Sequence, residues 1–378
     1  ALIASMVGAG DEAGVADIAA GLERRARNLL KDIVDPCAEI SFRALRVGAA
    51  LAAIVGNTPM MDDVRRTSWA AAFGERLDIA LGMPRLFQTT PVLVEGQTGT
   101  GKELVAQALC LSMPGSWKRG QGWTAAPTES VHLASLPESL AESALFGHEK
   151  GAYSGAHKDR QGVLERCHGG VVFLDEIAEL PMSTQVTLLR TLQEGTARRL
   201  GADKDHAAAP RIVSATHKDL SSLVGEDSFR LDLLYRLSSV VIKLPSLVDR
   251  LADIPLLVER EAQRIAEPAV RPALRDRFER FMKVHADYVW PGNVRELHAV
   301  VRTLALGLSP ALRDSVRPGK KIAVPKGIAD GTATLHEAQA WYCRRVVAKA
   351  KQMASAAKVL DIDRGTLRGY VVEGGDAE

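Results

Sequence analysis

Hydrophobic positions divide the chain into a helical start, a central region of alternating strands and helices, and a helical remainder. In residues 1 to about 50, apolar side chains recur at helical spacing, at Ile18, Leu22, Leu29, Leu30 and Ile33. From Ile54 onward, short apolar runs alternate with helical segments. Four runs predict buried strands, at 91–95, 170–174, 211–215 and 240–244. Strands that alternate with helices predict a parallel α/β sheet, with ligands at the carboxyl ends of its strands.

The pattern after residue 245 is helical in two blocks. The first block is expected to form a small lid domain, and residues rich in Pro, Gly, Lys and Arg then indicate a linker. The second block is expected to form a compact terminal unit. We therefore expect a helical linker or regulatory remnant in 1–52, an α/β domain in 53–245, a lid in 246–308, a linker in 309–332 and a terminal unit in 333–378.

Composition limits the classes of function. Hydrophobic residues make up 46% of the 378 residues and charged residues 25%, which is ordinary for a globular protein. A net charge of +2 does not suggest that the whole protein binds a polyanion, so contact with nucleic acid should be local. The four cysteines lie far apart, which predicts no disulfide framework or metal cluster and fits a reducing cytoplasm. No apolar run approaches the roughly 20 residues of a membrane span.

A glycine-rich turn follows the first strand predicted in the α/β region. It consists of Gly96, Gln97, Thr98, Gly99, Thr100, Gly101, Lys102 and Glu103. In this pattern the glycines let backbone N–H groups close around phosphates, and the lysine reaches the outer phosphates. The turn therefore predicts an ATP site. The residue after Lys102 is Glu103, where a Ser or Thr that binds Mg²⁺ is usual.

Two carboxylates end the second predicted strand. Asp175 and Glu176 follow the apolar run 171–174. Beside a phosphate-binding turn, Asp175 is expected to hold Mg²⁺ and Glu176 to orient and polarise the attacking water. Together the turn and the carboxylates predict ATP hydrolysis.

The segment 147–156 reads Gly-His-Glu-Lys-Gly-Ala-Tyr-Ser-Gly-Ala, and nucleotide chemistry does not require it. Its last six residues are Gly151, Ala152, Tyr153, Ser154, Gly155 and Ala156. They resemble the GAFTGA loop with which bacterial enhancer-binding proteins, the AAA+ activators of sigma-54 RNA polymerase, grip their target. The resemblance covers about residues 54–306 and implies that ATP is spent on remodelling the closed promoter complex.

The resemblance assigns further roles. Arg230 and Arg236 match the paired arginine fingers that reach the γ-phosphate of a neighbouring subunit, which implies a ring, expected to be a hexamer. Thr216 matches the sensor I threonine of the family. Arg295, in the motif at 290–297, matches the sensor II arginine, which touches the nucleotide and reports its state to the lid.

Several positions depart from the family pattern. Tyr153 and Ser154 stand where Phe and Thr are usual, and the segment from Met61 to Pro91 is longer than expected. His132 and His217 stand where Asn is usual. In the family the first of these asparagines relays nucleotide state to the catalytic glutamate, here Glu176. We therefore hypothesise that hydrolysis survives with altered coupling.

The terminal unit resembles a Fis-type DNA-binding helix-turn-helix. Asp361 occupies the turn, where Gly is more usual, and Asp tolerates the left-handed conformation better than most residues. Arg364, Thr366 and Arg368 are then expected to face DNA upstream of promoters. The alternative for this unit is a role in dimerisation alone. For the whole chain, the alternatives are a ring ATPase with another target and a DNA-binding regulator that no longer activates sigma-54.

Overall fold

The computed structural model describes residues 36–75, 83–118, 122–312, 326–350 and 353–372. They fall into two compact units, divided between Arg313 and Asp314, which are described separately. The apolar stripe predicted between Ile18 and Ile33 lies outside the described residues.

A five-stranded parallel sheet forms the centre of the first unit. Its strand order is β11 (Val240–Lys243), β1 (Val92–Glu95), β10 (Arg211–Thr216), β7 (Val171–Asp175) and β4 (Thr128–His132). The predicted parallel sheet is thus confirmed, and β4 is a strand that the apolar runs did not predict. The reason is that β4 lies at an edge of the sheet and no residue in it is fully buried.

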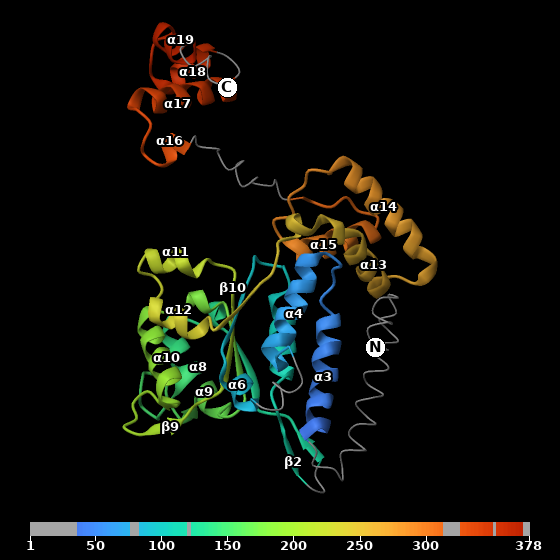
Figure 1. Ribbon diagram of the computed structural model, residues 1–378, viewed down its shortest axis with the longest axis vertical. Coiled ribbons are helices and arrows are strands. Elements are labelled where there is room, and N and C mark those ends of the chain that lie inside the picture. The colour runs from blue at the N-terminus through green and yellow to red at the C-terminus, as the bar shows by residue number, and fades with distance from the viewer. Residues whose placement is uncertain (1–35, 76–82, 119–121, 313–325, 351–352, 373–378) are drawn as a thin grey trace. The chain divides into compact units, whose positions relative to one another are not determined.

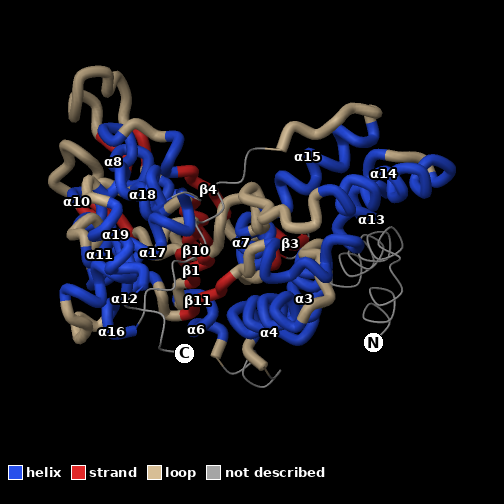
Figure 2. Tube along the Cα trace, turned by 90° about the horizontal axis from the view of Figure 1, so that it is seen from above, coloured by secondary structure: helices blue, strands red, loops and turns tan. Residues whose placement is uncertain are grey.

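Helices cover both faces of the sheet because alternate strand residues face opposite sides (Figures 1 and 2). In β1, Val94 belongs to one apolar core and Leu93 to the other. The first layer contains α3 (Pro36–Ala52), α4 (Pro59–Phe73) and α7 (Lys102–Leu111). The second contains α8 (Glu138–Phe146), α9 (Val163–Arg166), α10 (Met182–Glu194), α11 (Leu220–Gly225) and α12 (Leu231–Leu237).

Shorter elements connect these layers. One antiparallel hairpin pairs β5 (Gly147–His148) with β6 (Arg160–Gln161), and another pairs β8 (Thr196–Arg198) with β9 (Asp205–Ala207). The remaining short elements are α6 (Pro84–Thr89), β2 (Ser116–Lys118), β3 (Gly122–Thr124), η1 (Leu133–Ser135) and η2 (Ile177–Glu179). Helix α6 lies within the long segment noted between Met61 and Pro91.

A helical lid follows the last strand and has its own core. It consists of η3 (Leu247–Asp253), α13 (Ile254–Ile265), η4 (Pro268–Val270), α14 (Arg271–Val284) and α15 (Asn293–Ala305). Trp290, 1% exposed, and Leu297, fully buried, lie in this core. The nearly buried Glu261 accepts hydrogen bonds from Arg302 and Arg264, which offsets the cost of burying its charge.

The second unit contains α16 (Lys326–Ala329), α17 (Leu335–Ala350), α18 (Met353–Leu360) and α19 (Arg364–Val372). Ala356 and Leu367 are fully buried where the last three helices meet. Asp361, in the turn between α18 and α19, has a φ of 54°, so it adopts the left-handed conformation predicted for it. Among all the described helices, none combines the length and apolar character that crossing a membrane requires.

Candidate nucleotide site and projecting loop

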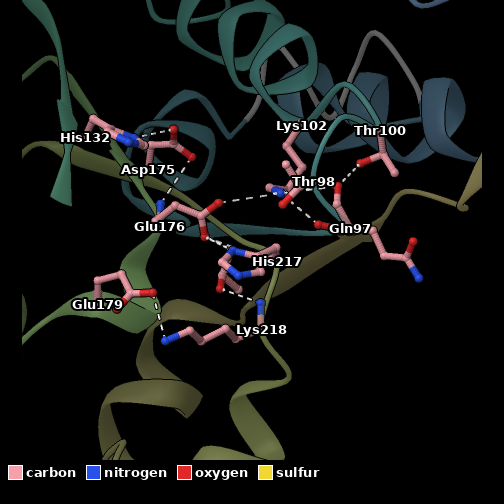
Figure 3. Close-up of polar contacts among 12 residues, drawn as sticks. Gln97, Thr98, Thr100, Lys102, His132, Asp175, Glu176, Glu179, His217 and Lys218 are labelled. Carbon is pink, nitrogen blue, oxygen red and sulfur yellow. Dashed lines mark hydrogen bonds and ion pairs between the residues drawn. The ribbon is translucent and has the colours of Figure 1, made fainter. Parts of the chain in front are cut away.

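The carboxyl ends of four strands bring the predicted nucleotide residues together (Figure 3). The phosphate loop follows β1, the two carboxylates end β7, His132 ends β4, and Thr216 ends β10. Thr216 is fully buried, and its carbonyl accepts a hydrogen bond from Gly96 N at 3.2 Å. Its hydroxyl accepts from Lys218 N at 3.0 Å. Thr216 therefore joins β10 to the start of the phosphate loop.

The phosphate loop ends at Lys102, the first residue of α7. Gly99 and Gly101 have φ values of 80° and 108°, which an L side chain rarely adopts. Lys102 is 8% exposed, and its Nζ donates to Gly96 O at 2.8 Å. Burial lowers the pKa of Lys102 below its usual value, and Glu176 and Asp175 act against that shift. Glu103 is exposed at the beginning of α7, so its carboxylate does not fill the loop.

The two histidines contact the two carboxylates separately. His132 Nδ1 lies 2.8 Å from Asp175 Oδ2, and His217 Nδ1 lies 2.7 Å from Glu176 Oε2. The family's asparagine at the position of His132 relays nucleotide state to the glutamate, whereas the His132 imidazole here is paired with Asp175. His132 lies directly opposite Asp175 in the register of β4 and β7, so Asp175 is the carboxylate within its reach.

Glu176 turns away from β4 and toward β10. Its φ of 57° is left-handed, a strained conformation that is common at functional sites. Its Oε2 accepts hydrogen bonds from His217 N and its Oε1 lies 3.8 Å from Lys102 Nζ. Glu176 is therefore held beside the lysine of the phosphate loop.

Two residues at the start of α15 lie beside the phosphate loop. Arg295 is exposed, and a Cβ built on Gly99 would be 3.0 Å from Arg295 Cβ. Asn293 is 1% exposed, and its Nδ2 donates to Gln97 Oε1 at 3.2 Å and to Thr98 O at 3.0 Å. The sequence motif predicted Arg295 but not the buried contacts of Asn293; the only signal for them was the position of Asn293 inside that motif.

The two predicted arginine fingers lie on the other side of the sheet from α7. Arg230 caps α12, its side chain is 38% exposed, and its guanidinium pairs with Asp232 at 2.7 Å. Arg236 is exposed and donates to Leu192 O at 2.7 Å. In the described part of the chain, neither side chain contacts the phosphate loop. The structure therefore does not bring these arginines to the nucleotide site of their own chain.

The loop between β5 and β6 carries Tyr153 and Ser154. Gly151, Ser154 and Gly155 are exposed, Ala152 and Tyr153 are half-buried, and Ala156 is buried. The Tyr153 ring packs edge-on against His148, with centroids 5.1 Å apart, and the His148 imidazole is hydrogen-bonded to Ser143 Oγ at 2.7 Å. Glu149 N donates to Leu200 O, beside β8, at 2.9 Å. The loop thus has a fixed base and an exposed tip.

In the second unit, Arg364, Thr366 and Arg368 are exposed on α19. The Thr366 hydroxyl is hydrogen-bonded to Asp363, whose carboxylate also accepts from Thr366 N at 3.0 Å and from Gly365 N at 2.7 Å. Asp363 therefore caps the start of α19. Thr366 helps to hold this cap, whereas the two arginines remain exposed at the surface.

A parallel sheet, a phosphate loop, an acidic strand end and a helical lid together define the AAA+ class of proteins. Comparison with known families agrees: residues 83–243 match the sigma-54 interaction domain, and residues 248–310 match an AAA+ ATPase lid domain. The region 83–310 is therefore a sigma-54 interaction domain followed by an AAA+ lid.

Similar proteins include transcriptional regulators. The regulatory protein GlrR of Escherichia coli strain K12 is 42% identical over 229 residues, covering 60% of this chain and 49% of GlrR. The Nif-specific regulatory protein of Azotobacter vinelandii is 40% identical over 259 residues, covering 67% of this chain and 44% of that protein. The chain thus spans about half the length of the curated relatives it matches.

Among solved structures, NtrX from Brucella abortus matches with a TM-score of 0.53 and 26% identity. The match covers 88% of this chain and 73% of the NtrX chain. NtrX has also been solved in complex with ADP and with ATP.

Proposed function

We propose that this chain is an ATP-hydrolysing activator that remodels the closed complex of sigma-54 RNA polymerase. The observation that carries the proposal is the combination, within one sigma-54 interaction domain, of a nucleotide site with a projecting Tyr-Ser loop. Either feature alone would fit several ring ATPases. Together they link a source of energy to a contact surface for the sigma factor.

The described residues fit ATP with Mg²⁺. The buried amine of Lys102 and the backbone N–H groups of the loop offer positive charge to phosphates. Asp175 would hold Mg²⁺, which when bound neutralises charge on the outer phosphates. Glu176 would orient and polarise the attacking water, and Thr216 and Arg295 would report the state of the nucleotide.

The arginines of α12 support assembly into a ring, which we propose to be a hexamer. Arg230 and Arg236 would act on the nucleotide of the neighbouring subunit. Near them, Tyr235 is 71% exposed and Leu231 is 50% exposed, and both line a cavity of about 500 Å³. Exposed apolar groups beside a cavity suit a protein interface. A head-to-tail contact of this kind joins different faces of identical subunits and so closes rings.

The loop 151–156 would contact sigma-54. The exposed tip offers a hydroxyl at Ser154, and the ring of Tyr153 is half-buried against His148. The antiparallel pairing of β5 with β6 and the contact with Leu200 give the tip a rigid support, so movement in the ATPase core would reach it. Tyr153 keeps the aromatic surface of the family loop.

The second unit would bind DNA upstream of promoters. Its three packed helices and the exposed Arg364 and Arg368 support a helix-turn-helix in which α19 enters the major groove. In this proposal the regions are a linker or regulatory remnant (1–52), the ATPase (53–245), the lid (246–308), a linker (309–332) and the DNA-binding unit (333–378). Helix α3, within the first region, packs on α7 of the ATPase. We place the protein in the cytoplasm, where promoters lie.

The test is binding of purified sigma-54 by this chain in the presence of ADP and a metal-fluoride mimic of the γ-phosphate. We expect a stable complex for the wild type and none for Tyr153→Ala. The variant should keep its ATPase activity, because Tyr153 has no contact with the described nucleotide residues. If the wild type hydrolyses ATP without binding sigma-54, the chain is instead a ring ATPase with another target or a regulator that no longer activates.

A further inference from the structure

The lid holds three successive carbonyl groups of the phosphate loop. Asn293 Nδ2 donates to Thr98 O at 3.0 Å, and Val294 N donates to Gly99 O at 3.0 Å. Arg250 Nη2 donates to Thr100 O at 3.2 Å. Arg250 belongs to η3 and the other two residues to α15, so two separate lid elements contact the loop.

These contacts fix the direction in which the loop presents its N–H groups. A trans peptide is planar, and its C=O and N–H point in opposite directions. The described peptide bonds are all trans. Because the lid holds the carbonyls of residues 98, 99 and 100, the N–H groups of Gly99, Thr100 and Gly101 point away from the lid contacts, and Thr100 N donates to Gln97 O at 3.3 Å. These are groups of the kind that bind phosphate at the start of a helix.

Arg250 is an unusual group to find in this position. It is 2% exposed, and its Nη1 donates to Val55 O at 3.4 Å and to Met61 Sδ at 2.8 Å, while its buried Nε has no hydrogen-bond partner among the described residues. None of the three acceptors of Arg250 is a carboxylate. Thr100 O and Val55 O are backbone carbonyls, and Met61 Sδ is a thioether sulfur. Burial lowers the pKa of Arg250, and the nearby Asp253 acts against that shift. Burying a charge is costly, and an apolar side chain would fill the space at less cost.

Asn293 is held just as firmly. It is 1% exposed, and its φ of 50° is left-handed, a conformation that Asn tolerates better than most residues. Its Oδ1 accepts from Leu247 N at 2.7 Å, while its Nδ2 reaches the phosphate loop. One amide thus links η3, α15 and the loop.

We propose that Arg250 and Asn293 are positioning residues through which the lid sets the shape of the phosphate loop and its affinity for nucleotide phosphates. The proposal rests on the nucleotide binding proposed above. A shift of the lid would turn the three peptides, and phosphate held by their N–H groups would in turn hold the lid. The coupling needs no contact between either side chain and the nucleotide.

Two variants test this role in the full chain. Arg250→Met keeps the length of the side chain and removes its donors. Asn293→Gly removes the amide, and glycine adopts the left-handed φ without strain. We expect each to raise the Kd for ADP with Mg²⁺, measured by calorimetry, by roughly five- to fifty-fold, since each lost hydrogen bond contributes about 1 kcal/mol or more. The KM for ATP should rise in parallel, whereas kcat at saturating ATP should stay within about threefold.

Arg211→Met is the matched control. Arg211 is 1% exposed and donates to Thr90 O, Ser112 Oγ and Ala71 O, none of which belongs to the phosphate loop. Its loss should lower the melting temperature and leave the Kd for ADP unchanged. Wild-type affinity in folded Arg250→Met and Asn293→Gly would overturn the proposal, as would an equal loss of affinity in Arg211→Met. Failure of the wild type to bind ADP would instead overturn the proposed function.

Discussion

The nucleotide site and the outer surface of α12 hold their charged groups in opposite ways. Lys102 and Glu176 are buried or nearly buried, lie 3.8 Å apart and contact several strand ends. Arg230 and Arg236 lie at the surface, and within the described residues their side chains donate to Asp232 and to Leu192 O. The first region gathers a lysine and two carboxylates beside the phosphate loop, and the arginine next to that loop, Arg295, comes from the lid. The second carries two arginines that, among the described residues, make no contact with the phosphate loop of their own chain.

One chain therefore carries two halves of a proposed catalytic site. The buried half contains Lys102 and Glu176, and the exposed half contains Arg230 and Arg236. The two halves lie on different layers of the sheet, because α7 packs on one face and α12 on the other. A head-to-tail ring would bring the arginines of one subunit to the pocket of the next. ATP hydrolysis would then depend on assembly.

The largest loss of ATP turnover is expected from the two exposed arginines of α12. Arg230→Ala and Arg236→Ala should each lower ATP turnover by about 10³-fold or more, which is the contribution usual for arginine fingers. The Kd for ADP should change by less than about threefold, because these side chains are absent from the chain's own pocket. Turnover assays and calorimetry on the same preparations check both parts. A variant that loses ADP binding would place the arginine in its own chain's pocket and so break the comparison.

A change at Glu176, in the buried nucleotide site, should lower ATP turnover and leave ATP binding intact. Glu176→Gln removes the group expected to polarise water, and turnover should fall by about 10²- to 10⁴-fold. ATP binding should remain, because the Gln amide occupies the same space beside Lys102. The measurement is single-turnover hydrolysis with labelled ATP. Near wild-type turnover would show that another residue polarises the water.

The separate contacts of the two histidines predict separate defects. His132→Ala removes the partner of Asp175, so about tenfold more Mg²⁺ should be needed for half-maximal turnover. His217→Ala removes the imidazole that contacts Glu176, so kcat should fall about tenfold with the Mg²⁺ requirement unchanged. Titration of Mg²⁺ in both variants separates these effects. The same defect in both would contradict the separate pairing.

The smallest effect is expected at the apolar surface beside the arginines. Tyr235→Ser and Leu231→Ser should weaken assembly, so the protein concentration needed for half-maximal specific activity should rise about three- to tenfold. Each side chain is at least half exposed in the single chain, so the melting temperature of the dilute protein should change little. Analytical ultracentrifugation across the concentration range measures this. Unchanged assembly would place the subunit interface elsewhere.

Burial explains how far the sequence predicted the fold. The strands β1, β7 and β10 are almost entirely buried, so their apolar runs were readable, and the phosphate loop and the carboxylates could be placed at their ends. The edge strand β4 is only partly buried and left no such run. Its register against β7 in turn decides that His132 meets Asp175, a pairing that the sequence did not predict.

The contacts of the lid could not be predicted for a different reason. Arg250 and Asn293 are polar residues in helical segments, and such residues are usually exposed. Only the folded chain brings them behind the phosphate loop. For Arg230 and Arg236 the opposite holds. Their motif predicted a role from the sequence, but the proposed target of that role lies on another subunit.

The most direct test of the two-half account mixes Arg230→Ala subunits with Glu176→Gln subunits. Each variant alone should be almost inactive. In a mixed ring, an intact pocket from the first variant can meet an intact arginine from the second, and at equal amounts about a quarter of the interfaces are complete if subunits mix at random. Mixing should therefore restore a substantial part of wild-type ATP turnover. Activity equal to the sum of the two separate variants, in rings shown to exchange subunits, would contradict it.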